Sequence, residues 1–309
     1  MSCKTERVEP VITGTPDVDK SAAANAAPIV YPQFTVRTIA GIFEQQNSEP
    51  HLVNGPGPKA KFWKPHGISV AIDGSIYIAD FFNGAIRKIS VTNEVTTIAI
   101  PKTYLLLPEA VEVGNDGTFY IVSTGYGVRI YNKNGIDLNS RIGNADSNLD
   151  IEKDDKGGLW FVNSNSLCKI TGVDIQRNVV NFSSLLSTGE TLRAIATGPN
   201  GVKYVSSATQ LFKVAADGKI TKLFTDTNFT FISGIDVTKD GSTLYIVDGN
   251  TIKKIYQNKI SVIAKPTSGD GKDGIGLSAD IVGANLALSN SETALFVTDT
   301  RNTIRKIQL

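Results

Sequence analysis

The sequence contains few of the residue types that redox and metal centres depend on. Its 309 residues include two cysteines, two histidines, two tryptophans and one methionine. Nothing in the sequence supports a disulfide between Cys3 and Cys168, and Cys168 stands inside an expected strand, which favours an inert, packed thiol. No G-x-S-x-G, H-E-x-x-H or phosphate-binding loop occurs, so the short motifs of several enzyme classes are absent.

The chain also lacks a charge of one sign, a long apolar run and helical periodicity. Lys and Arg number 31 against 30 Asp and Glu, so the net charge of +1 gives no electrostatic argument for nucleic acid or a membrane surface. The sequence contains no run of 18 or more apolar residues, which is the length that a membrane-spanning helix needs. Thr, Ser, Asn and Gly are plentiful, and an apolar fraction of 41% can supply a sizeable core. An all-β fold is therefore expected, and such folds of this length often form one domain.

One stretch, PHGISVAIDGSIYIADFFNGAIRKI at residues 65–89, contains the pattern of three consecutive strands. Ile68, Val70 and Ile72 alternate with small residues before Asp73-Gly74, a strong two-residue hairpin signal. The following run, residues 76–79, is continuously apolar, which is typical of a strand covered on both faces. Three strands cannot bury two apolar faces alone, so other parts of the chain must cover them.

The chain contains this pattern six times, so neighbouring copies can cover the apolar faces of each three-stranded unit. An aromatic residue in each second strand recurs at intervals of 40 to 51 residues, at Tyr77, Tyr120, Trp160, Tyr204, Tyr245 and Phe296. A tight-turn signal precedes each aromatic, a third strand follows each, and five units continue into a fourth strand. Four-stranded units of this length form a β-propeller, in which neighbouring blades cover each sheet.

The sixth unit ends at Leu309 after its third strand, and the missing strand appears near the N-terminus. Residues 34–41 (FTVRTIAG) resemble the fourth strands at residues 94–99 and 259–264. An N-terminal strand that completes the last blade would close the ring and remove a free sheet edge. We therefore predict a six-bladed β-propeller over residues 34–309, closed by its N-terminal strand.

The repeat resembles NHL repeats, whose consensus contains Pro-x-Gly-Ile-x-Val, a glycine turn, Tyr-Ile-Ala-Asp, an Asn and Ile-Arg-Lys-Ile. Residues 65–89 match it almost throughout, and residues 244–255 and 295–307 match its second half. The other three units are degenerate, with Ser123, Asn163 and Ser206 where the Asp would stand. The resemblance covers about residues 34–309 and implies the fold, but this fold carries many unrelated activities.

Enzymes that resemble this fold can be compared with the chain. Peptidylglycine amidating lyases use a histidine-bound zinc. This chain has only two histidines, His51 and His66, which nearly excludes such a zinc site. Gluconolactonase-type enzymes hold a divalent metal with Glu, Asn and Asp, for which Glu109 and Asp150 are candidates without a matching Asn. Virginiamycin B lyase depends on a catalytic histidine. His66 is a candidate for that residue, but one histidine alone is weak support for a lyase. RNA-binding NHL domains rely on a basic face, which the near-neutral charge does not favour.

Residues 1–33 contain Pro, Ala, Ser, Thr and charged residues without periodicity, which predicts a flexible N-terminal tether. Cys3, in Met-Ser-Cys-Lys, resembles the acylated cysteine of a mature bacterial lipoprotein. No hydrophobic signal segment precedes it here, so this hypothesis requires a natural chain that begins further upstream. The alternative is an incidental cysteine in a disordered tail. We expect a monomer in the bacterial cell envelope, which would meet the membrane only through a lipid on Cys3.

The residues just before each first strand are expected near the propeller axis, on the face where such folds usually bind ligands. In chain order these are His66, Glu109, Leu149 with Asp150, Arg193, Ser233 and Ala284. Four of these positions place ionisable groups near one funnel, which favours a binding site or an acid–base site. The alternative is a solvated rim. Aromatic residues in loops of the same face could stack on a sugar ring or grip a peptide: Trp63, Phe81, Phe82, Tyr104 and Tyr126.

The acidic residues of the repeat have a simpler interpretation. Asp80, Asp248 and Asp299 stand in tight turns, where a carboxylate accepts backbone N–H groups and the following Asn83, Asn250 and Asn302 tolerate left-handed geometry. Residues 269–274 superficially resemble a calcium loop but lack its alternating ligands and final Glu, so a flexible connection is expected.

The preferred hypothesis is a non-catalytic binding module whose ligand is a glycan or a peptide. It requires no cofactor, no metal and no nucleic acid. The residues expected to bind are Trp63, His66, Phe81, Phe82, Tyr104, Glu109, Tyr126, Asp150 and Arg193. The alternative is a metal-assisted hydrolase or lyase that uses the same funnel.

Overall fold

The structure is a computed structural model that describes residues 32–43, 51–101, 107–138, 150–172, 174–225 and 229–309. The predicted lipid attachment at Cys3 and the predicted ligand contact at Tyr104 lie outside the described residues. The compact unit that contains the described residues runs from Pro32 to Leu309. The regular structure of the described residues consists of β-strands and short 3-10 helices. No helix within the described ranges is long and apolar enough to cross a membrane.

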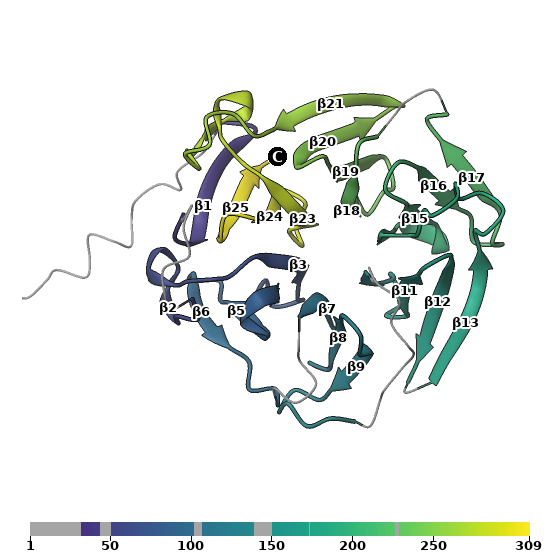
Figure 1. Cartoon of the computed structure of the whole chain (residues 1–309), viewed down its shortest axis with the longest axis horizontal. Coiled ribbons are helices and arrows are strands. Elements are labelled where there is room, and N and C mark those ends of the chain that lie inside the picture. The colour runs from purple at the N-terminus through teal and green to yellow at the C-terminus, as the bar shows by residue number, and fades with distance from the viewer. Residues whose placement is uncertain (1–31, 44–50, 102–106, 139–149, 173, 226–228) are drawn as a thin grey trace, which may run out of the picture. The chain divides into compact units, whose positions relative to one another are not determined.

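Six sheets follow one another along the chain, and each forms one blade (Figure 1). Blade 1 contains β2 (Gly55–Pro56), β3 (Pro65–Val70), β4 (Ile76–Asp80), β5 (Ala85–Ile89) and β6 (Glu94–Thr97). Blade 2 contains β7 (Pro108–Val113), β8 (Phe119–Ser123) and β9 (Gly127–Tyr131). Blade 3 contains β10 (Ile151–Lys153), β11 (Leu159–Asn163), β12 (Ser166–Thr171) and β13 (Asp174–Asn181).

The second half of the ring continues the pattern. Blade 4 contains β14 (Ala194–Thr197), β15 (Lys203–Ser206), β16 (Leu211–Val214) and β17 (Ile220–Leu223). Blade 5 contains β18 (Ile232–Val237), β19 (Thr243–Asp248), β20 (Thr251–Tyr256) and β21 (Lys259–Ala264). Blade 6 contains β22 (Gly274–Ile275), β1 (Thr35–Gly41), β25 (Thr303–Gln308), β24 (Ala294–Asp299) and β23 (Gly283–Leu288). The 3-10 helices are η1 (Gly57–Lys59), η2 (Phe81–Asn83), η4 (Pro199–Gly201) and η5 (Gly276–Ser278).

The first full strand of each blade lies nearest the axis, and these inner strands contact one another around the ring. The successive contacts are β3 with β7, β7 with β10, β10 with β14, β14 with β18, β18 with β23, and β23 with β3. Close approach depends on the glycine of the repeat, because a Cβ added to Gly67 would lie 2.6 Å from the Glu109 carbonyl oxygen. The predicted six-bladed propeller is confirmed.

The predicted closure is present in blade 6. β1 pairs antiparallel with β25, with Val36 opposite Ile307 and Gly41 opposite Thr303. Its other edge pairs with the two-residue strand β22. Val36, Ile39 and Ala40 are buried, so the N-terminal strand is part of the core and not a surface addition.

Six hydrophobic clusters fill the spaces between neighbouring blades. The cluster between blades 1 and 2, for example, joins Tyr77 and Ile86 to Val111 and Ile121. Cys168 is fully buried in the cluster between blades 2 and 3, which agrees with the prediction of a packed thiol. Each blade is thus covered on both faces by its neighbours, as the apolar second strands require.

Buried arginine–aspartate pairs hold the loops of blades 1 and 6 against their sheets. Arg87 Nη1 donates to Asp80 Oδ2 at 2.9 Å, and the guanidinium also donates to the carbonyl oxygens of Lys61 and Val53. At the equivalent place in blade 6, Arg305 Nη1 donates to Asp299 Oδ2 at 3.2 Å. The prediction of structural turn carboxylates is confirmed, because Asp80, Asp248 and Asp299 all accept backbone N–H groups.

Two details of the turns differ from the sequence-based expectation. Gly84, with φ of 55°, takes the left-handed position in blade 1, while Asn83 lies in η2 and donates to Asp80 Oδ2. The loop at residues 269–274 is tied to blade 6, because Asp273 accepts from Arg305 Nη2 and from the Thr38 backbone N–H. A flexible connection was therefore the wrong expectation for this loop: its carboxylates are satisfied by a buried arginine and by backbone donors.

Candidate functional site

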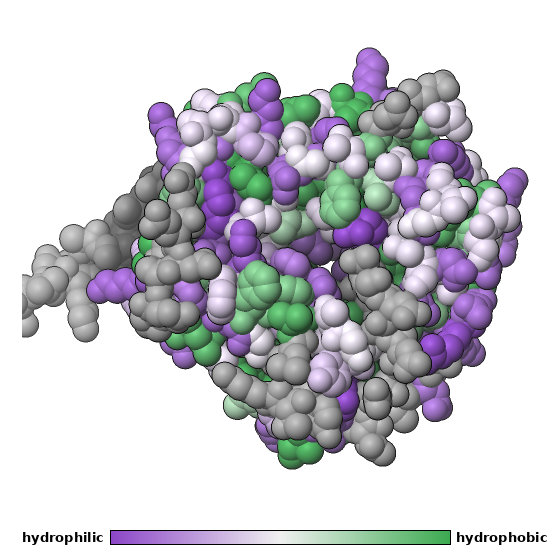
Figure 2. Space-filling model, in the orientation of Figure 1, coloured by the Kyte–Doolittle hydropathy of each residue, from purple (hydrophilic) through white to green (hydrophobic). Residues whose placement is uncertain are grey.

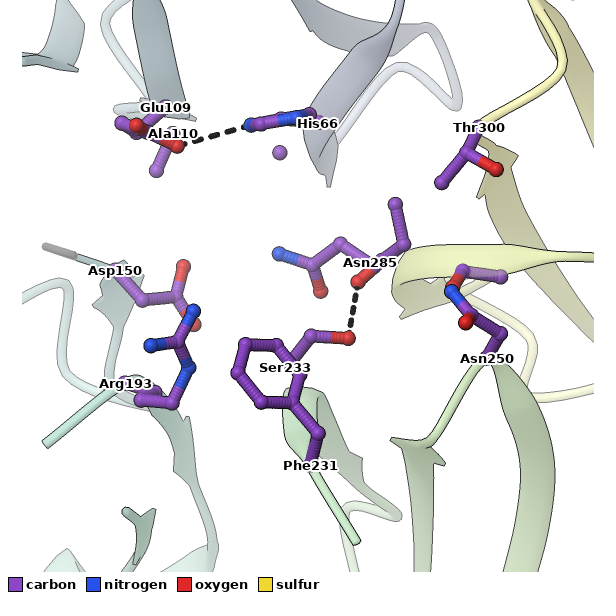
Figure 3. A pocket seen from close by; sticks show the side chains of 13 residues that line it. His66, Glu109, Ala110, Asp150, Arg193, Phe231, Ser233, Asn250, Asn285 and Thr300 are labelled. Atoms are coloured by element: carbon purple, nitrogen blue, oxygen red, sulfur yellow. Dashed lines mark hydrogen bonds and ion pairs between the residues drawn. The ribbon is translucent and has the colours of Figure 1, made fainter. Parts of the chain in front are cut away.

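A cavity of about 290 Å³ lies at one end of the propeller axis (Figure 3). Viewed down the axis, the surface of the ring is hollowed at its centre, with hydrophilic residues bordering the hollow (Figure 2). Five of the positions predicted to meet near the axis line the cavity together with Asp150: His66, Glu109, Arg193, Ser233 and Ala284. The equivalent starts of the inner strands bring them together, because each strand approaches the axis at the same point of the repeat.

A hydrogen bond between side chains joins blades 1 and 2 at the cavity wall. His66 Nδ1 lies 2.9 Å from Glu109 Oε2, and Thr124 Oγ1 donates to Glu109 Oε1 at 2.8 Å. Burial by itself would raise the pKa of Glu109, but the hydrogen bonds from His66 and Thr124 outweigh it and hold this pKa below its ordinary value. Glu109 is therefore an ionised carboxylate whose two oxygens already have partners.

Arg193 and Phe231 form the opposite wall. The guanidinium carbon of Arg193 lies 4.0 Å from the centre of the Phe231 ring, which is a close cation–π contact. Phe231 is 43% exposed, so the pair borders open space instead of the core. Burial lowers the pKa of Arg193 while the nearby charge of Glu109 raises it, and an arginine stays protonated in either case.

The predicted aromatic residues form a strip beside the cavity. Phe81 stacks on His66 with ring centres 4.2 Å apart, and Phe82 lies edge-on to Phe81. Trp63 continues the strip, packed between Phe82 and His51. Trp63 is partly buried and does not line the cavity, whereas Phe82 is 47% exposed. Tyr126 is partly buried in the loop between β8 and β9. Ligand contact by any of these rings stays a prediction.

Four further polar or aromatic residues of the cavity wall were not predicted from the sequence: Phe231, Asn250, Asn285 and Thr300. The repeat contained a signal for each of them. Phe231 and Asn285 flank the predicted positions Ser233 and Ala284. Asn250 and Thr300 stand in the loops of blades 5 and 6 that correspond to the loop of Phe81 and Phe82 in blade 1. Extending the alignment by two residues on either side of each first strand, and to every such loop, would have found them.

A second cavity of about 590 Å³ lies where the inner strands end. Three carboxylates from the inner strands β7, β10 and β18 border it: Glu112, Glu152 and Asp236. Glu112 accepts from Lys153 Nζ at 3.0 Å and from Ser69 Oγ at 2.8 Å. Within the described residues, no group of three or more His, Cys, Asp or Glu side chains is arranged to hold a metal ion.

Comparison with known proteins identifies the repeat. A family profile described as the Teneurin NHL domain matches residues 32–233, which is more than half of the chain. The chain belongs to this family. No curated protein matches the sequence significantly. The Teneurin NHL match ends inside blade 5, but the blades beyond it continue the same strand pattern to Leu309.

Solved structures similar to this NHL domain include both binding proteins and enzymes. An auxiliary nutrient binding protein from Bacteroides thetaiotaomicron superposes with a TM-score of 0.71 at 12% identity, over 92% of this chain and 78% of that one. Virginiamycin B lyase from Staphylococcus aureus gives a TM-score of 0.59 at 17% identity, over 80% and 95% of the two chains. A gluconolactonase from Xanthomonas campestris gives 0.57 at 13% identity, over 80% and 86%. At these identities the similarity establishes the fold alone.

Asp150 is the most perturbed carboxyl group of the axial cavity. Burial in the channel, together with the negative charges of Glu112 and Asp236, raises its pKa to about 7, although the backbone N–H groups of Ile195 and Ile151 donate to its oxygens and act in the opposite direction. Its pKa in the unfolded chain is near the ordinary value of 3.8. The group is therefore protonated at mildly acidic pH in the folded state only.

The Asp150→Asn variant of this NHL domain is expected to lose part of the dependence of stability on pH. Because the folded pKa lies above the unfolded one, protonation stabilises the native state fully below about pH 4, and this contribution disappears as the pH rises through about 7. The free energy of unfolding of the variant, relative to that of the wild type, should therefore increase between these two pH values. Urea denaturation at several pH values measures it. Parallel pH profiles of the two proteins would contradict the assignment.

Proposed function

We propose that this NHL domain is a binding protein that takes a glycan or peptide ligand at the axial cavity. The observation that carries the proposal is the cavity itself, where one end of the axis gathers polar side chains from all six blades beside a strip of aromatic rings. The site is concave, as ligand sites usually are, and its mainly polar wall with aromatic area beside it suits a polar ligand. Its volume of about 290 Å³ suits the end group of a longer ligand.

The similar structures support the same choice without establishing it. One of them is named as an auxiliary nutrient binding protein, and a binding role for this chain follows that example. The alternative of a hydrolase or lyase follows the other neighbours, which are named as a lyase and a gluconolactonase. The hydrogen bond between the His66 imidazole and the Glu109 carboxylate is compatible with either role, because it fixes both groups at the cavity wall.

The proposal is tested by filling the cavity. Ala284 lines it and is partly exposed, so an Ala284→Trp substitution places an indole in the open volume. Ligands found by screening the wild-type protein against glycan and peptide arrays should bind this variant at least about tenfold more weakly, because the hot-spot contacts are lost. Calorimetry measures the change, and thermal melting checks that the variant is folded.

The matched control is Asn115→Trp, an exposed position at the mouth of the second cavity. This variant should bind every array ligand as the wild type does. Equal binding by the wild type and the folded Ala284→Trp variant would refute a site at the axial cavity. Conversion of a bound ligand to product by the wild type would favour the hydrolase or lyase alternative.

A further inference from the structure

The guanidinium of Arg193 has no hydrogen-bond partner among the described residues, and this suggests what the cavity binds. The Nε of Arg193 is buried and has no hydrogen-bond partner among the described residues. Its guanidinium lies against the face of the Phe231 ring. A guanidinium presents five N–H donors in a planar fork that matches a carboxylate. Desolvating such a group without partners costs stability, so an arginine kept in this state at a cavity wall is arranged for an anionic ligand.

The acidic groups of the cavity do not neutralise this arginine. Glu109 is close enough to act on Arg193 electrostatically, but its two oxygens accept from His66 and Thr124. Asp150 accepts backbone N–H groups through both oxygens, and burial leaves it partly protonated near neutral pH because its pKa is about 7. The charge of Arg193 thus remains available at the cavity surface.

The remaining groups of the wall suit a hydroxylated ring. The Asn285 side-chain oxygen accepts from the Leu286 backbone N–H, which leaves its amide nitrogen directed into the cavity (Figure 3). Phe231 on one side and the His66 ring, backed by Phe81, on the other offer flat ring surfaces. At about 290 Å³ the cavity is roughly twice the ~150 Å³ that holds a benzene molecule, which is room for one substituted six-membered ring.

We propose that the cavity takes a carboxylated monosaccharide, a uronic acid, whose carboxylate pairs with Arg193 and whose ring lies between the aromatic surfaces. This inference rests on the proposed binding function and names its ligand class. A peptide C-terminus is disfavoured, because such termini are usually held by consecutive backbone N–H groups, whereas the anion partner here is a side chain. The uronic acid is either free or the terminal residue of a glycan.

Calorimetry with four sugars tests the ligand class: glucuronate and galacturonate against neutral glucose and galactose. The uronates should bind the wild type more tightly than the neutral sugars, and added salt should weaken uronate binding. An Arg193→Gln variant should bind the uronates on the order of 10- to 100-fold more weakly, because a charge-assisted pair is lost. The neutral sugars should bind both proteins equally.

The matched control is Arg177→Gln, which removes the same charge from an exposed position on the outer strand β13. It should leave uronate affinity unchanged. A di- or trisaccharide with a terminal uronic acid distinguishes the two sources, since tighter binding than the free acid indicates a glycan end and equal binding a free monosaccharide.

The inference is overturned if uronates bind no better than neutral sugars, or if Arg193→Gln binds uronates as the wild type does. It is also overturned if peptides with a free C-terminus bind in an Arg193-dependent manner while uronates do not. In each of these cases the Ala284→Trp variant still decides the proposed function separately, because that variant blocks any ligand in the cavity, charged or neutral.

Discussion

The free energy of unfolding of an Arg87→Met variant is expected to be about 3–5 kcal/mol lower than that of the wild type, because the substitution removes one partner of a buried ion pair. The side chains of Arg87 and Asp80 are both fully buried, so the substitution leaves a carboxylate without its cation in the protein interior. It also removes one donor each from the carbonyl oxygens of Lys61 and Val53 and from the side chain of Asn54. The substitution also removes the guanidinium from above the Phe62 ring, whose centre lies 4.8 Å from the guanidinium carbon, while methionine keeps an unbranched apolar stem.

The equivalent substitution in blade 6 provides a graded control. Arg305→Met also breaks a pair of fully buried side chains, but Asp299 keeps Arg301, whose Nε lies 3.1 Å from Asp299 Oδ1. The other carboxylate that loses Arg305, Asp273, is 46% exposed and keeps the Thr38 backbone N–H, so the loss of stability should be smaller than for Arg87→Met. A double variant, Asp80→Asn with Arg87→Met, should recover part of the loss, since no uncompensated charge is left. Urea denaturation of the four proteins measures these differences, and a loss below about 1 kcal/mol for Arg87→Met would contradict the role assigned to the pair.

Deletion of residues 1–41 should destabilise the propeller by several kcal/mol or cause it to aggregate. The deletion removes β1, whose pairing covers the edges of β25 and β22. Burial of Val36 and Ile39 alone contributes about 3–6 kcal/mol, taking about 1.5–3 kcal/mol for each side chain. The exposed edge of β25 would also be free to pair with another chain.

Deletion of residues 1–31 is the control, because β1 and its pairings remain intact. Its melting temperature should equal that of the full chain. A Val36→Asp variant of the full chain separates core loss from edge exposure, since it disrupts the same cluster while keeping the strand in place. Thermal melting and size-exclusion chromatography serve as measurements, and equal melting temperatures for both deletions would rule out closure by β1.

The sequence predicted the blades because each one is a local pattern. The Asp73-Gly74 turn, the apolar run at residues 76–79 and the Pro-x-Gly start are readable without any partner, and their recurrence implies a ring. The same recurrence placed His66, Glu109 and Arg193 near one axis, where the structure brings them together. The periodicity of the sequence therefore predicted both the fold and the position of the candidate site on the propeller axis.

Other features were decided by the tertiary structure, because they depend on contacts between distant residues. Trp63 packs between His51 and Phe82 and not in the cavity, since the geometry of its loop lies outside the repeat. The short strand β22 forms because Asp273 meets Arg305 and Thr38 from opposite ends of the chain.

The charge states of the axial groups show the same division. The sequence by itself determined which residues face the axis, because side-chain direction follows strand register. It could not determine that Glu109 is paired, that Asp150 has a pKa of about 7, or that the Arg193 guanidinium has no described hydrogen-bond partner. Those properties depend on distances of a few ångströms between blades and on the burial of these groups, which only the assembled ring sets.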